Sequence, residues 1–291
     1  MKSQYLLSIG VTLALSVLAP RDAVAGPWVQ APGHAYIKMW ARYLPGFSYF
    51  DGNGTRFDYA SYHELFFSTY AEVGLARGVG VSLHLPIAQI FALSDPSINR
   101  TQIHATVGDP TVAMRFELLR YRRALLSVEA GLRLPVATGE VVQPVISARE
   151  PYVPVGGLRI GNGTADVSMT LHGGVLFRHW YTAGSIGAVY RNNGYDPAAT
   201  INLEAGTQLL KGRLGLRARV GAYLSLPWGT APRHDSPSGM GNGTRYWGFA
   251  VEADYRVARN WALGLSFEGG AGPIRRQTGG PVINLYAAAQ F

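Results

Sequence analysis

The chain of 291 residues contains no cysteine. This absence excludes disulfides, thiolate catalysis, iron–sulfur clusters and Cys-ligated zinc, and also the acylated cysteine of a bacterial lipoprotein. Charged residues are scarce as well, at 15% against roughly 25% in an average soluble domain. Together with 36 glycines and 16 tyrosines, and without low-complexity runs, this composition argues against a disordered chain and against a typical cytosolic enzyme.

Long apolar runs are also missing after residue 25. The longest uncharged stretch, residues 78–94, is interrupted by Gly80, His84 and Pro86. A membrane-spanning helix needs about 20 consecutive apolar residues. The sequence therefore predicts no transmembrane helix in this part of the chain.

The first 25 residues have the order of a secretory signal peptide. Lys2 precedes a largely apolar stretch, residues 5–19, and a small-residue site, Ala23-Val24-Ala25, follows. The apolar stretch is short for a membrane span, so a retained anchor is the less favoured alternative. We expect cleavage after Ala25 and export of residues 26–291 as a single domain.

Period-two alternation dominates the exported part. Residues 62–76, 213–226 and 246–257 each place apolar side chains on one face and charged or polar ones on the other. Alternation alone fits a soluble sandwich or a barrel. Strands of this length exceed the usual five or six residues of soluble sheets and are typical of tilted membrane strands.

The connections alternate in length too. Short turns are predicted near 77–78, 121–123, 179, 211–212 and 259–260, and long loops at 45–59, 93–102, 138–159, 192–199, 228–244 and 274–281. The predicted strands, about twelve in number, are 33–44, 60–76, 79–92, 103–120, 124–137, 160–178, 180–191, 200–211, 213–227, 245–258, 260–273 and 282–291. Short periplasmic turns, long extracellular loops and an even strand count predict an all-β, antiparallel transmembrane β-barrel of the bacterial outer membrane.

The last strand carries a further signal. Residues 283, 285, 287, 289 and 291 share one apolar face that ends in the aromatic Phe291. Resemblance to outer-membrane proteins implies that this terminal residue is a sorting and assembly signal for the barrel-assembly machinery.

Three segments carry a family resemblance. Residues 107–115 read Val-Gly-Asp-Pro-Thr-Val-Ala-Met-Arg, residues 129–140 contain Leu-Arg-Leu-Pro followed by Thr-Gly-Glu, and residues 160–167 read Ile-Gly-Asn-Gly-Thr-Ala-Asp-Val. In order and spacing, residues 105–170 resemble the outer-membrane barrels named for the meta-pathway of phenol degradation. Residues 135–139 depart from the family, which more often closes up to Pro-Thr-Gly. The resemblance implies a transporter or channel for small, often aromatic or hydrophobic, molecules.

The polar faces of the strands predict the lining of the lumen. Because an Arg or Lys facing lipid at the bilayer midplane costs about 2–4 kcal/mol, these charges are expected to point inward. The predicted lining residues are Lys38, Arg42, Glu64, Glu72, Arg115, Glu117, Glu129, Arg133, Asp166, Glu204, Arg217, Arg219, Glu252 and Asp254. Either they line a selective pore or they neutralise one another and stabilise the barrel. A constriction is expected where Arg217 and Arg219 face Glu204, Glu252 and Asp254 across neighbouring strands.

The tetrapeptide Gly-Asn-Gly-Thr occurs three times, at residues 52–55, 161–164 and 241–244, near the outer start of predicted strands. Asn and Gly tolerate positive φ, so the favoured interpretation is a tight turn. A ligand-binding rim or a trace of internal duplication is an alternative.

Motifs for other functions are absent. None of the seven histidines stands in a catalytic or metal-ligand spacing, and neither a Gly-x-Ser-x-Gly elbow nor a phosphate loop occurs, so no enzyme activity, metal or cofactor is predicted. The formal net charge of +8 comes from scattered bases, which suit the phosphates of lipopolysaccharide and outer-membrane lipid better than nucleic acid. A barrel enzyme acting on lipids and a closed structural or adhesive barrel remain alternatives to a passive channel.

Overall fold

The computed structural model describes residues 27–95, 100–137, 141–142, 158–159, 161, 163–232, 241–275 and 277–291. The predicted signal peptide lies outside these residues. All regular structure in the described part is β-strand. None of the described residues forms a helix that is long and apolar enough to cross a membrane.

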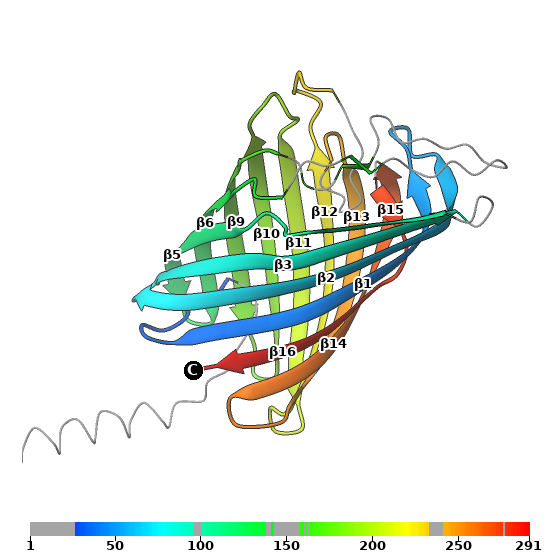
Figure 1. Ribbon diagram of the computed structural model, residues 1–291. Helices are drawn as coiled ribbons and strands as arrows, with labels where there is room; N and C mark the ends of the chain where they lie inside the picture. Colours follow the sequence, from blue (N-terminus) through cyan, green and yellow to red (C-terminus); the bar gives the residue numbers. More distant parts are fainter. Residues whose placement is uncertain are drawn as a thin grey trace, which may run out of the picture.

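Twelve antiparallel strands form a closed ring (Figure 1). In wall order they are β1 (Ala35–Phe50), β2 (Arg56–Ala76), β3 (Val79–Asp95), β5 (Thr111–Tyr121), β6 (Ala124–Arg133), β9 (Asp166–Leu176), β10 (Trp180–Arg191), β11 (Ala198–Leu209), β12 (Leu214–Ser225), β13 (Arg245–Arg256), β14 (Trp261–Arg275) and β16 (Val282–Gln290). β16 closes the ring by pairing with β1 from Tyr36↔Gln290 to Tyr43↔Ile283. The predicted twelve-stranded barrel is confirmed.

Four shorter strands complete the structure. β4 (Arg100–Thr106) pairs with β3 beyond the end of the β3–β5 ladder. In the same way, β15 (Gln277–Gly279) pairs with β1 beyond the end of the β1–β16 ladder. β7 (Val141–Val142) and β8 (Leu158–Arg159) form a separate two-stranded ladder. Because β4 and β15 occupy wall positions that another strand already holds, they add no position to the ring.

The structure corrects two predicted boundaries. Most of the predicted loop 45–59 is strand, because β1 and β2 pair as far as Phe50↔Arg56 around a bulge between Gly46 and Ser48. The bulge breaks the alternation from which strands are predicted. The predicted strand 103–120 is interrupted at 107–110. There, the Asp109 side chain accepts hydrogen bonds from the backbone N–H groups of residues 136 and 137.

The two faces of the wall differ as the alternation predicts. Outward-facing apolar side chains such as Ile186, Leu203 and Val251 are half or more exposed, whereas most charged and polar side chains on the alternate positions are buried or half-buried. Outward-facing residues also differ in how far they lie from the ends of their strands. Val251 lies near the middle of β13, but Leu216 is the third residue of β12. The outward face is therefore suited to lipid, with Val251 nearer the middle of the apolar band than Leu216.

The two ends of the barrel have different connections (Figure 1). At one end, the short-turn end, strands are joined by tight turns such as 77–78, 122–123 and 210–213. At the other, the long-loop end, the described connections include 192–197 and part of 226–244. In outer-membrane barrels the short turns are periplasmic and the long loops extracellular.

An N-terminal segment, residues 27–34, lies against the inner wall at the short-turn end. The Ser127 hydroxyl donates to the Pro27 carbonyl at 2.9 Å, and the Gly33 N–H donates to the Gly74 carbonyl at 2.9 Å. The approach is close, because a Cβ on Gly74 would lie 2.2 Å from the Ala31 carbonyl oxygen. Polar contacts to β2 and β6 therefore hold this segment across the mouth of the barrel, which the sequence analysis did not predict.

Candidate functional site: the charged lumen and its two cavities

The central cluster consists of Lys38, Arg217, Glu252, Asp254 and Tyr286, on β1, β12, β13 and β16. The Arg217 guanidinium lies 2.7 Å from a Glu252 oxygen, contacts Asp254 and donates to the Tyr286 hydroxyl at 3.1 Å. Lys38 Nζ lies 3.1 Å from Glu252 and 3.8 Å from the centre of the Tyr286 ring. Since β14 and β16 separate β1 from β13 in the wall, the Lys38–Glu252 pair spans part of the lumen.

Two residues of the predicted constriction lie outside this cluster. Glu204 and Arg219 are opposite in register on β11 and β12, yet Glu204 instead accepts a hydrogen bond from the Tyr181 hydroxyl at 2.5 Å. The Arg219 side chain is 51% exposed, and its nearest carboxylate is Glu268 at 3.9 Å. A tyrosine on the next strand thus satisfies Glu204, and Arg219 extends into open space.

A second group, the Arg115 cluster, lies across β2, β5 and β6. Arg115 makes two hydrogen bonds to Glu129, at 2.6 and 3.0 Å, and lies 3.8 Å from Glu72. The Tyr70 hydroxyl donates to Glu72 at 3.1 Å, and Arg115 also approaches the Trp28 carbonyl at 3.5 Å. The cluster therefore links the barrel wall to the N-terminal segment.

The Asp166 cluster lies at the long-loop end. Asp166 contacts Arg133 at 2.5 Å and Arg191 at 3.6 Å, and it accepts a hydrogen bond from the Thr164 hydroxyl at 3.0 Å. The Arg191 side chain is fully buried and also donates to the Gly241 carbonyl at 3.2 Å. The cluster joins β6, β9 and β10 to the segment that precedes β13.

The Gly-Asn-Gly-Thr repeats are turns, as predicted, since Gly54, Gly163 and Gly243 all have positive φ. Their asparagines differ in role. Asn242 is fully buried and accepts a hydrogen bond from the Asp196 N–H at 2.8 Å, whereas Asn53 is exposed. Asn162 lies outside the described residues. One repeat therefore anchors neighbouring loops, although the tetrapeptides are identical.

The remaining predicted lining residues pair locally. Arg42 lies 3.1 Å from Glu64, which also accepts a hydrogen bond from the Tyr62 hydroxyl. Glu117 pairs with Arg120 at 2.6 Å beside the 122–123 turn, away from the clusters above. Among the described residues, no group of three or more His, Asp or Glu side chains could hold a metal ion.

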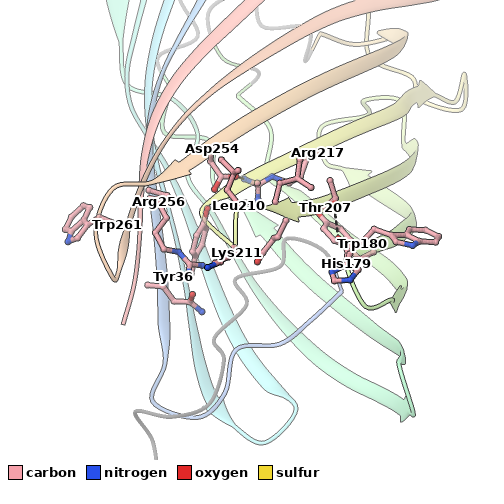
Figure 2. Close-up of a pocket in the computed structure, with 18 of the residues that line it drawn as sticks. Tyr36, His179, Trp180, Thr207, Leu210, Lys211, Arg217, Asp254, Arg256 and Trp261 are labelled. Atoms are coloured by element: carbon pink, nitrogen blue, oxygen red, sulfur yellow. Dashed lines mark hydrogen bonds and ion pairs between the residues drawn. The ribbon is translucent and has the colours of Figure 1, made fainter.

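Two cavities lie on either side of the central cluster. The inner cavity, about 790 Å³, is at the short-turn end, and its lining includes Arg217, Asp254 and Tyr286. Figure 2 shows Arg217 and Asp254 at its inner end, above Arg256, Lys211 and Tyr36. The outer cavity, about 770 Å³, is lined by Arg42, Arg219, Tyr223 and Glu268 among others. The central cluster thus separates two chambers of ligand size.

The outer cavity also reaches the outward face of the barrel. Its lining includes Phe47, Phe249 and Phe267, which are exposed on that face. Here the wall is incomplete. The ladder between β14 and β16 stops at Glu268↔Val282, and in the described part the continuation of β14 pairs only with β13. β15 pairs with β1 instead.

Comparison with known proteins shows the fold. The structure is similar to an outer membrane channel from Pseudomonas putida F1, with a TM-score of 0.66 and 12% identity over 94% of this chain and 100% of that one. It is also similar to the NanC porin (TM-score 0.54, 5% identity, 87% and 98% covered) and to the transport unit of the autotransporter AIDA-I from Escherichia coli (0.51, 8%, 98% and 97%). No family model and no curated protein matches the sequence. At these identities the likeness establishes an outer-membrane type of β-barrel.

Proposed function

We propose that the chain is a non-enzymatic outer-membrane channel through which small hydrophobic or aromatic molecules pass by passive diffusion. Export by a signal peptide cleaved after Ala25, assembly by the barrel-assembly machinery, and contact with lipopolysaccharide and lipid are part of the proposal. The barrel fold supports the location. The resemblance of residues 105–170 to the phenol-degradation barrels supports the substrate class.

The observation that carries the proposal is the double-sided lining of the outer cavity. Lumen residues such as Arg219 and outward-facing aromatic residues such as Phe249 and Phe267 line the same space. An apolar molecule that enters from outside can therefore reach lipid beside β14 without crossing the ion pairs of the central cluster. A hydrophilic solute gains nothing from that route, since lipid offers its polar groups no hydrogen bonds.

A tryptophan placed in the outer cavity tests this route. Ala250 is buried on the inward face of β13 and lines the cavity, whereas Ala253 is on the opposite face of the same strand. Ala250→Trp should reduce uptake of the apolar probe N-phenyl-1-naphthylamine by cells with an intact outer membrane to the level of cells without the protein. Ala253→Trp, present at equal surface level, should leave uptake unchanged.

The rival functions give different results in the same preparations. Probe uptake that Ala250→Trp leaves unchanged would contradict the proposed route. Liposome swelling with sucrose as fast as that of an open porin would identify a hydrophilic pore. Release of fatty acid from phospholipid by the purified protein would favour an enzyme, and neither transport nor hydrolysis would favour a closed structural barrel.

A further inference from the structure

The inner cavity carries an excess of positive charge that the proposed function does not use. Its lining contains five side chains that are always or usually cationic, Arg178, Lys211, Arg217, Arg256 and Arg259, against one carboxylate, Asp254. Arg217 already engages that carboxylate. We call this cavity the basic vestibule.

Four of these cations have no counter-charge among the described residues. Within the described part of the chain, no carboxylate lies within 4 Å of Arg178, Lys211, Arg256 or Arg259, although the three clusters of the lumen pair their charges. Arg256 continues the inward face of Glu252 and Asp254 toward the short-turn end. Like charges in one cavity repel one another, so an anion that entered it would be attracted by several cations at once.

The turn that carries Lys211 holds an unfavourable backbone conformation. Leu210 and Lys211 have φ values of 51° and 57°, and Gly212 follows at 79°. Residues other than Gly, Asn and Asp seldom adopt this region, because it is sterically unfavourable for a side chain. Figure 2 shows Leu210 and Lys211 at the cavity, near Arg256 and Tyr36. The turn thus presents a cation to the vestibule at a conformational cost.

Aromatic side chains also contribute to the wall of the vestibule. Tyr36, Tyr181 and Tyr286 line the vestibule from the inward faces of β1, β10 and β16, and Trp180 and Trp261 lie at its rim. A volume of about 790 Å³ is within the usual range of small-molecule sites, about 300–1,000 Å³. The vestibule therefore combines apolar surface for a ring with unpaired donors for one anionic group.

We propose that the basic vestibule binds small aromatic carboxylates on the periplasmic side of the central cluster. The carboxylate is held by Arg256 and Lys211, and the ring lies against the tyrosines. This proposal deepens the proposed function, on which it rests, by adding an anionic substrate class.

Binding can be tested separately from transport. The protein in phosphatidylcholine nanodiscs is titrated with 4-nitrobenzoate and with its neutral counterpart 4-nitrobenzyl alcohol, whose nitroarene rings quench tryptophan fluorescence. Trp180 and Trp261, which lie at the rim of the vestibule, report the quenching. We expect 4-nitrobenzoate to bind at least about tenfold more tightly than the alcohol, and the double variant Arg256→Gln/Lys211→Gln to abolish the difference.

Arg213→Gln is the matched control. Arg213 is on the same turn as Lys211 and is exposed, but it does not line the vestibule, so its neutralisation should leave 4-nitrobenzoate binding within about twofold of the parent. Equal quenching by acid and alcohol in the parent, or equal losses in the control and the double variant, would overturn the proposal. So would abolition of 4-nitrobenzoate binding by 30% phosphatidylglycerol in the nanodiscs, which would assign the cations to lipid phosphates. If the channel proposal is wrong, the uptake assay with the apolar probe shows it, and the result of this titration is unaffected.

Discussion

The Asp166 cluster and the basic vestibule, at opposite ends of the barrel, differ in how their charges are paired. At the long-loop end, Asp166 contacts both Arg133 and the fully buried Arg191. At the short-turn end, Lys211 and Arg256 line a cavity in which the one carboxylate is already bound by Arg217. A buried charge must be paired, because burying it alone costs several kcal/mol. A charge in a water-accessible mouth carries no such penalty and is available to a ligand.

From this difference we expect the Asp166 cluster to contribute to stability and the basic vestibule to contribute to ligand binding. The Asp166 cluster holds loops and strands together, so its loss should be measured as unfolding. The basic vestibule holds little together, so its loss should be measured as altered ligand binding. Each substitution at a buried or central position is paired with a control substitution at a position that is less constrained.

The largest effect is expected from Asp166→Asn. The substitution keeps the shape of the side chain but removes the carboxylate that lies 2.5 Å from Arg133 and 3.6 Å from the fully buried Arg191. Breaking a buried pair by removing one partner typically costs about 3–5 kcal/mol. Urea unfolding in lipid vesicles, followed by tryptophan fluorescence, measures the loss. Arg256→Gln at the opposite end should change the free energy of unfolding by less than about 0.5 kcal/mol. Equal losses would remove the contrast between the two ends.

Arginine scanning of the outward face tests how the wall sits in the membrane. Val251→Arg, near the middle of β13, should cost about 2–4 kcal/mol, whereas Leu216→Arg, whose register partner Ala253 lies two residues closer to the short-turn end, should cost less. The same unfolding assay applies, together with the yield of inserted protein. A Leu216→Arg variant as unstable as Val251→Arg would mean that the membrane reaches further toward the short-turn end than we infer.

The repeated turns give an internal comparison at smaller scale. Asn242→Ala removes the acceptor of the Asp196 N–H and also donors to the carbonyls of residues 231 and 232. Groups left unsatisfied and buried cost about 1–3 kcal/mol. Asn53→Ala, in an exposed turn of the same sequence, should change stability by less than about 0.5 kcal/mol. Matching values would show that Asn242 is as accessible to water as Asn53.

Features set by residues close together in the sequence were predicted more completely than contacts between residues far apart in it. Alternation and turn length are local, so β10 was predicted with both bounds correct at 180–191, and most other long strands within a few residues. Facing was predicted for the same reason. Arg217 contacts Glu252 and Asp254, the carboxylates expected on the neighbouring strand. The partners of Lys38 and Glu204 were not predicted, because Lys38 meets Glu252 across the lumen and Glu204 accepts a hydrogen bond from a tyrosine.

Contacts that depend on closure of the ring were missed for a physical reason. Arg191 is the last residue of β10, where it was assigned no role, and it becomes fully buried only when residues 241–244 fold over it. The N-terminal segment has no alternation and no charge, and its position rests on backbone contacts to Gly74 and on Ser127. A glycine whose missing side chain lets another backbone segment approach cannot be recognised from a single sequence.

The smallest thermodynamic effect is expected at the seam that closes the ring. Phe291 exchanges two backbone hydrogen bonds with Ala35, at 2.9 and 3.1 Å, and its exposed ring meets Trp261 edge to face at 6.4 Å. Deleting Phe291 leaves the β1–β16 ladder from Tyr36 to Tyr43 intact, so refolded protein should lose only about 1 kcal/mol. In cells, the same deletion should lower the amount of assembled barrel severalfold if the terminal aromatic residue is an assembly signal, and Phe291→Tyr should restore it. Normal surface levels of the truncated chain would contradict the signal. A loss of several kcal/mol in the refolded protein would instead mean that the seam, like the Asp166 cluster, contributes strongly to the stability of the barrel.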